Sequence, residues 1–134
     1  MRSRKICSGQ AAKASVVKSD AVVRVAALSA AIAIAAGAFG AHGAGEQAKE
    51  WLRTGASYQL PHAVAAIAVA RLDPRIGWVL LAGAAVFGFS LYAMAVGAPR
   101  WFGAITPIGG AAMIVGWLWL AFARRPAAVR AIDD

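Results

Sequence analysis

Charged side chains are scarce in this chain and are missing from four long stretches of it. Only 15% of the 134 residues are charged, whereas about 25% is usual for a soluble domain. The deficit comes from four uncharged apolar runs, which cover residues 25–41, 54–70, 76–96 and 102–123. This distribution excludes an ordinary soluble domain, and the length leaves room for one domain only.

Each uncharged run is long enough to cross a membrane. The runs hold 17, 17, 21 and 22 residues, and a bilayer core about 30 Å thick requires about 20 helical residues, within a range of ~17–25. Lipid offers the backbone no hydrogen-bond partners, so only helices and closed barrels span it. Because the runs are continuous rather than alternating, the sequence predicts an all-α integral membrane four-helix bundle with short loops.

Two polar segments flank the predicted four-helix domain of residues 22–123. Residues 1–21 are rich in Ser, Lys and Ala and lack a sustained apolar face, so we expect a disordered cytoplasmic leader or an arm on the membrane surface. Residues 124–134 are expected to form a cytoplasmic tail. A basic leader followed by an apolar run and small residues is also typical of a cleavable secretory signal, and cleavage would leave three spans.

Basic residues outnumber acidic ones, and their distribution predicts the topology. The chain has 14 Lys and Arg against six Asp and Glu, a net charge of +8. With four spans, eleven of the basic residues lie on the side of the two termini and three on the other side. Basic residues stay cytoplasmic, so we expect a multi-pass protein of the cytoplasmic (inner) membrane with both termini inside. Topology and attraction of the leader to anionic lipid headgroups account for the charge, so no nucleic-acid partner is expected.

Residue patterns that support catalysis are also missing. The single cysteine, Cys7, excludes an internal disulfide, and the chain has neither a Gly-x-Ser-x-Gly turn nor a phosphate-binding loop. The four runs contain no carboxylate. Ser90 and a histidine could form a nucleophile–base pair, but nothing positions a third member. We therefore expect no enzymatic activity, no catalytic residue and no cofactor.

Polar residues inside the runs gather toward one face of the membrane. In the predicted topology they fall at the outer end of the first span and in the outer halves of the other three, whereas the inner half offers little beyond Ser29. The candidate residues for an outer polar cluster are His42, Tyr58, Gln59, His62, Ser90, Tyr92 and Thr106.

Two interpretations of the outer polar cluster remain open. It could form an outward-facing pocket for a small polar ligand, a lipid headgroup or a metal held by His42 and His62. Alternatively, its members bond to one another and hold the helices together, at about 0.6 kcal/mol per bond. Two histidines are too few for a closed zinc site, which takes four ligands, so no metal is assigned. Proton-coupled transport usually needs an ionisable group within a span, and His62 is the one good candidate.

Small residues predict close contacts between helices. Every fourth position from Ala33 to Gly45 is Ala or Gly, which is the small-xxx-small pattern of membrane helix packing. The pattern fits packing within one monomer or a specific dimer contact. The glycines expected to pack against neighbouring helices are Gly37, Gly40, Gly109, Gly110 and Gly116.

Proline and tryptophan positions predict bends and membrane boundaries. Pro61 removes a backbone donor from the second run, which predicts a kink or a helix start displaced toward His62. Trp78 and Trp117 fall near the inner boundary and Trp101 at the outer one, as expected of interfacial aromatic belts.

The same residues resemble a known family, domain-of-unknown-function family 423, which includes bacterial YgdD-like proteins and the animal transmembrane protein 256 group. The resemblance covers about residues 22–123. It rests on the segments Gly37-Ala38-Phe39-Gly40-Ala41-His42-Gly43, Trp51, Thr54-Gly55, Tyr58-Gln59, His62, Ser90-Leu91-Tyr92, Gly103, Thr106-Pro107-Ile108-Gly109-Gly110 and Gly116-Trp117. It implies a small multi-span helical inner-membrane protein and implies no activity.

Together these features predict a small, non-enzymatic membrane protein with a structural or accessory role. The alternative is a transporter-like or ligand-binding bundle that uses the outer polar cluster. Four alanine-rich helices cannot easily enclose a lumen, so a transport pathway would require a homo-oligomer. The expected partners are the lipid bilayer itself and anionic headgroups at the leader.

Overall fold

The computed structural model describes residues 2–123, and this part of the chain is helical throughout apart from short turns. Its elements are α1 (Arg2–His42), α2 (Glu46–Val69), α3 (Pro74–Ala95), the 3-10 helix η1 (Arg100–Ala104) and α4 (Thr106–Phe122). The predicted all-α class and the short loops are confirmed. The predicted tail at residues 124–134 lies outside the described residues.

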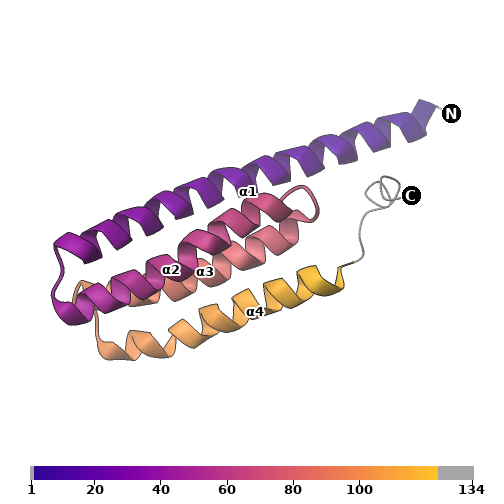
Figure 1. Cartoon of the computed structure of the whole chain (residues 1–134). Coiled ribbons are helices and arrows are strands. Elements are labelled where there is room, and N and C mark those ends of the chain that lie inside the picture. Colours follow the sequence, from indigo (N-terminus) through magenta and orange to yellow (C-terminus); the bar gives the residue numbers. More distant parts are fainter. Residues whose placement is uncertain (1, 124–134) are drawn as a thin grey trace.

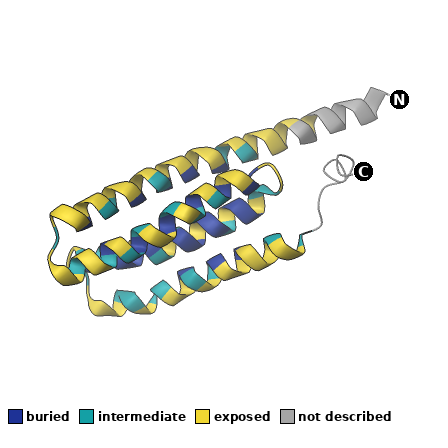
Figure 2. Cartoon of the chain, in the orientation of Figure 1, coloured by how far each residue is buried: buried dark blue, intermediate teal, exposed yellow. Residues whose placement is uncertain are grey.

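The four long helices run up and down beside one another (Figure 1). The central pair is formed by α2 and α3, with α1 and α4 on opposite sides of it. Helix α3 packs against α2, α4 and, over a shorter stretch, α1. Buried positions accordingly concentrate on α2 and α3, whereas α1 and α4 are mostly exposed (Figure 2).

The predicted boundary between a disordered leader and the first span is wrong, because α1 is one helix from Arg2 to His42. Residues 2–21 contain no proline and are rich in Ala, Lys and Arg, which are strong helix formers. Extending an existing helix avoids the free-energy cost of nucleation. The helix formed by the apolar span therefore continues through the polar residues that precede it.

Three helical stretches are long and apolar enough to cross a membrane, namely Lys13–His42, Pro74–Ala95 and Arg100–Phe122. Helix α2, the second of the four predicted spans, is not among these three stretches, because its Gln59 and His62 lower its hydropathy. Helix α2 still has 24 residues, about 36 Å of helix, and it lies between α1 and α3. Its neighbours cover polar side chains that would be costly to expose to lipid.

Proline and glycine lie at several of the helix ends. Pro61 lies inside α2, which begins at Glu46, so the expectation of a start displaced toward His62 is wrong. Gly97 ends α3 with a φ of 104°, a conformation that glycine adopts without steric cost. The fourth run begins as the 3-10 helix η1 rather than as α-helix, and α4 starts only at Thr106, where Pro107 occupies a first-turn position that needs no donor.

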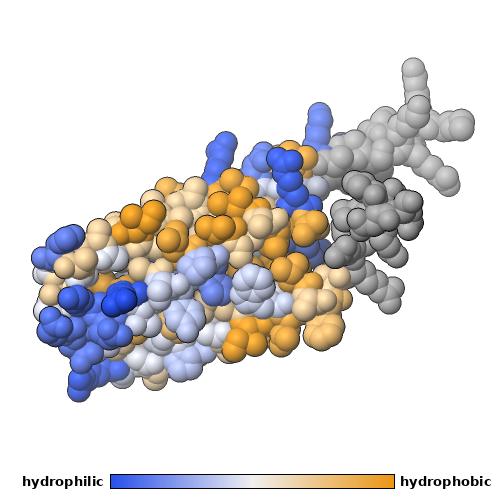
Figure 3. Space-filling view, viewed as in Figure 1, coloured by the Kyte–Doolittle hydropathy of each residue, from blue (hydrophilic) through white to orange (hydrophobic). Residues whose placement is uncertain are grey.

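A narrow stripe of α1 faces the other helices. Its buried residues recur every three, four or seven positions: Val22, Ala26, Ser29, Ala33 and Gly40. The remaining faces of α1 and most of α4 expose large apolar side chains. Hydrophilic side chains gather at the end that carries the α1–α2 turn, and apolar residues cover much of the remaining visible surface (Figure 3). An apolar exterior of this kind fits a lipid environment.

Glycines let α3 and α4 touch along their backbones. A Cβ added to Gly109 would meet the Phe87 amide nitrogen, and one added to Gly83 would lie 2.8 Å from the Met113 amide nitrogen. A Cβ at Gly116 would lie 2.7 Å from Leu80 Cδ2. The predicted packing roles of Gly109 and Gly116 agree with these contacts, whereas Gly83 was not among the predicted glycines.

The other predicted glycines differ in how closely they pack. At Gly40 an added Cβ would lie 3.0 Å from Leu52 Cβ, which is a tight contact. At Gly37 the nearest atom, Ala56 Cβ, lies at an ordinary 3.6 Å. At Gly110 the nearest atom, Phe87 Cδ2, lies 3.9 Å away, so Gly110 makes an ordinary contact rather than a tight one.

Candidate functional site

Gln59 of α2 is the centre of the polar residues inside the molecule. Its side chain is fully buried. Its Nε2 donates to Ser29 Oγ of α1 at 3.0 Å, and its Oε1 accepts from the Tyr92 hydroxyl of α3 at 2.7 Å. One amide thus connects three helices, and every hydrogen bond involved joins segments at least 30 residues apart in the chain.

Two glycines make room for this arrangement. A Cβ on Gly88 would lie 2.9 Å from Gln59 Oε1, and a Cβ on Gly55 would lie 2.5 Å from Tyr92 Cε1. The amide and the phenol ring therefore occupy space that any other residue at these positions would fill. We call Ser29, Gln59 and Tyr92, with their hydrogen bonds, the Gln59 network.

A second polar contact joins α3 to the start of α4. The hydroxyl oxygens of Ser90 and Thr106 lie 2.7 Å apart. Ser90 donates to the Phe87 carbonyl at 2.8 Å. Because a hydroxyl has one hydrogen, Thr106 is the donor in the contact with Ser90.

A third contact joins α4 to α2 through His62. Trp117 Nε1 donates to His62 Nε2 at 3.1 Å, and His62 Nδ1 lies 2.6 Å from the Tyr58 carbonyl. Indole is a donor only and a carbonyl is an acceptor only, so the hydrogen of this neutral imidazole is on Nδ1. Both ring nitrogens are occupied, and a metal could bind His62 only by displacing one of these partners.

His42 is not part of any of these contacts. It ends α1 with an exposed side chain, beside the turn that leads to Glu46. His62 follows Glu46 by 16 residues of α2, about 24 Å of helix. The structure therefore does not bring His42 and His62, the two weak metal candidates, together. No group of three or more His, Cys, Asp or Glu able to hold a metal is found among the described residues.

The structure brings together six of the seven candidate residues in pairs rather than around one pocket. Gln59 bonds with Tyr92, Ser90 bonds with Thr106, and His62 Nδ1 lies 2.6 Å from the Tyr58 carbonyl. The Tyr58 ring packs on Phe87 at a centroid distance of 4.7 Å. The side-chain polar groups of Gln59, Tyr92, Ser90, Thr106 and His62 bond within the protein rather than around one outward-facing hollow, whereas the Tyr58 side chain is exposed.

Two residues of these contacts were assigned elsewhere by the sequence. The sequence places Ser29 in the inner half, yet it bonds Gln59 at the same depth, because α2 begins at Glu46, well before its uncharged run. Ser29 thus lies 13 residues before the end of α1 and Gln59 lies 13 residues after the start of α2. Trp117 was interpreted as an interfacial anchor, although a Trp N–H in an apolar helix needs an acceptor.

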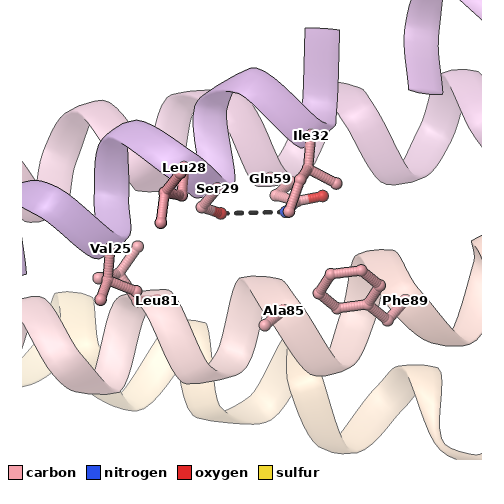
Figure 4. Close-up of a pocket in the computed structure, with 8 residues that line it drawn as sticks. All are labelled: Val25, Leu28, Ser29, Ile32, Gln59, Leu81, Ala85 and Phe89. Atoms are coloured by element: carbon pink, nitrogen blue, oxygen red, sulfur yellow. Dashed lines mark hydrogen bonds between the residues drawn. The ribbon is translucent and has the colours of Figure 1, made fainter. Parts of the chain in front are cut away.

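A small cavity lies beside the Gln59 network, between α1 and α3 (Figure 4). Its volume is about 150 Å³. Six of the eight lining residues are apolar, and the Ser29 and Gln59 side chains at its back are turned toward each other: the lining is Val25, Leu28, Ser29, Ile32, Gln59, Leu81, Ala85 and Phe89. We call this cavity the apolar crevice. It offers hydrocarbon contact and almost no polar surface.

A family model described as "Protein of unknown function (DUF423)" matches residues 36–110. The chain belongs to the DUF423 family. The DUF423 match contains Gln59, Tyr92, His62 and the Ser90–Thr106 pair, whereas Ser29 lies before it.

Relatives of similar size carry the same description as membrane proteins. The UPF0382 membrane protein YwdK of Bacillus subtilis is 36% identical over 110 residues, which is 72% of this chain and 89% of YwdK. The UPF0382 membrane protein of Haemophilus influenzae is 38% identical over 109 residues, 72% of this chain and 86% of that protein. The UPF0382 inner membrane protein YgdD of Escherichia coli is 38% identical over 106 residues, 69% of this chain and 79% of YgdD. No solved structure matches the chain significantly. This DUF423 member is thus a small helical membrane protein.

Proposed function

We propose that the protein is a non-enzymatic structural or accessory component of the cytoplasmic membrane, with both termini in the cytoplasm. The observation that supports this role is the Gln59 network, in which the polar groups expected to form a ligand pocket bond to one another. Helix-to-helix bonds of this kind contribute about 0.6 kcal/mol each on average. Their combined effect is to keep thin alanine-rich helices in one register.

The alternative, a transporter-like or ligand-binding bundle with an outward polar pocket, has less support from the geometry. Gln59 is fully buried, and both nitrogens of His62 have protein partners. A solute at this position would have to break bonds within the protein before it made its own.

The effect of added divalent metals on thermal stability distinguishes the structural role from the ligand-binding role. We expect divalent metals to leave the thermal unfolding midpoint of the detergent-solubilised wild type unchanged, since His62 has no free nitrogen. We expect His62→Ala to lower the midpoint, because it leaves the Trp117 N–H without an acceptor. His42→Ala is the matched control and should unfold like the wild type, because the His42 side chain is exposed. A metal-dependent rise that His62→Ala abolishes would overturn the structural role in favour of a binding site.

A further inference from the structure

The start of α3 and the neighbouring stretch of α1, residues 14–20, border a polar hollow. It is lined by Ser15 and Lys18 of α1 and by Asp73, Arg75 and Trp78 at the start of α3. A neighbouring hollow adds Arg71 and Asp20. Lys18, Arg71 and Arg75 are exposed, as is Trp78 at 40%. We call these two adjoining hollows the basic hollow.

Positive charge dominates the basic hollow. The Asp73 carboxylate is engaged as the N-cap of α3, where its Oδ1 accepts from the Arg75 backbone N–H at 2.9 Å. The lining of the two hollows then holds three cations, Lys18, Arg71 and Arg75, and one further carboxylate, Asp20. The indole of Trp78 lies at the point where α3 enters its apolar stretch, which is where tryptophan meets lipid headgroups.

The basic hollow and the apolar crevice lie on one line along the surface. On α1, Lys18 precedes Val25 by seven residues and Val25 precedes Ile32 by seven. On α3, Trp78 precedes Ala85 by seven. Seven residues are two helical turns, about 10 Å, and return to the same helix face. We call this line, where residues 14–32 run beside residues 74–89, the α1–α3 seam.

The spacing along the seam matches the layers of a membrane leaflet. Bilayers have a hydrocarbon core about 30 Å thick within ~40–45 Å in total, so the polar layer of each leaflet measures roughly 5–8 Å. A phosphate in the basic hollow would therefore have its acyl chains beginning near Val25 and Leu81. The apolar crevice is open at the surface and its lining is almost entirely apolar, so within a bilayer it is a place for hydrocarbon rather than for a polar group.

We propose that the α1–α3 seam binds one anionic glycerophospholipid. Its phosphate lies between Lys18 and Arg75, and a segment of one acyl chain fills the apolar crevice. Anionic lipids are abundant in the cytoplasmic leaflet, which is the leaflet in which the proposed topology places the basic hollow. The lipid would fasten the inner half of α1 to α3, where the Gln59 network does not reach.

The test compares lipid binding by the full-length protein in native mass spectra, with phosphatidylglycerol and phosphatidylcholine of identical chains. We expect one tightly held phosphatidylglycerol and much weaker phosphatidylcholine binding. Lys18→Ala/Arg75→Ala should weaken phosphatidylglycerol binding about thirty-fold, because each basic residue near an anionic surface contributes about 1 kcal/mol. Lys49→Ala/Arg53→Ala removes the same charge at the opposite end and should bind like the wild type. Equal binding of the two lipids, or equal losses in the two double variants, would overturn the proposal.

A second pair of variants tests the crevice independently of charge. Ala85→Phe fills the apolar crevice and should weaken phosphatidylglycerol binding at least ten-fold, whereas Ala82→Phe, at an exposed position of the same helix, should leave it unchanged. Glycerol phosphate, which carries the anion without chains, should not displace the lipid at millimolar concentration. Displacement by glycerol phosphate, or unchanged binding by Ala85→Phe, would show a simple anion site and contradict the seam.

Discussion

At the scale of single residues, the uncharged amide of Gln59 makes hydrogen bonds to two other helices. Gln59 has a donor and an acceptor on one rigid group, so it can serve Ser29 on one side and Tyr92 on the other. Burying an amide without partners costs roughly 1–3 kcal/mol in proteins, and both of its polar atoms have a partner here. The same bonds make this position sensitive to substitution.

Gln59→Leu should lower the free energy of unfolding in detergent by about 1–2 kcal/mol, because it removes two interhelical bonds that average about 0.6 kcal/mol and reach about 1.7. Tyr92→Phe removes one of them and should cost about half as much. The double variant should cost less than the sum, since the two residues share a bond. Ser57→Ala, which loses only a local bond to the Thr54 carbonyl, is the control. A Gln59→Leu protein as stable as the wild type would contradict the network's structural role.

At the scale of helices, the close contact between α3 and α4 depends on glycines, which have no side chain to hold the two backbones apart. The backbones of Gly83 and Gly109 are so close that a single methyl group would push the helices apart, whereas a Cβ at the neighbouring Gly110 would make only an ordinary contact, 3.9 Å from Phe87 Cδ2. Two adjacent glycines in the sequence thus have different structural roles. Their difference comes from the rotation of α4 about its own axis, which a run of apolar residues does not reveal.

We expect Gly109→Ala to destabilise the protein by about 1–3 kcal/mol, the usual cost of overpacking a tight contact. Gly110→Ala should be neutral or slightly stabilising, because alanine favours helix over glycine. The thermal unfolding midpoints of the two purified variants, measured in the same detergent, test this difference. Similar midpoints for both would mean that α4 is rotated differently from the arrangement described.

At the scale of the whole molecule, the charges at the two ends are unequal while the body between them is apolar. With four spans, eleven of the 14 Lys and Arg, among them Lys18, Arg71 and Arg75, fall on the side of the α2–α3 turn. The opposite side has only Lys49, Arg53 and Arg100. The positive-inside rule therefore favours the α2–α3 turn in the cytoplasm, the orientation on which the proposed lipid site depends.

Cysteine accessibility tests this orientation. In a Cys7→Ser background, Gly45→Cys in the α1–α2 turn should react with a membrane-impermeant maleimide added to intact cells. Leu72→Cys in the α2–α3 turn should react only after the cells are lysed. Labelling of Leu72→Cys in intact cells would invert the topology and place the basic hollow in the outer leaflet.

The sequence by itself determined that the chain is a helical membrane protein, because uncharged runs of this length have few other stable environments. It also indicated the DUF423 family and several of the residues that bond between helices. It could not show that α1 continues through the basic leader, because the composition of residues 1–21 fits either a disordered segment or an extension of the helix that follows. Only the tertiary structure decided that Gln59 bonds Ser29 and Tyr92, that His62 bonds Trp117, and that His42 stands apart. The physical reason is that these contacts depend on how far each helix is rotated and shifted against its neighbours, and apolar runs leave both quantities open.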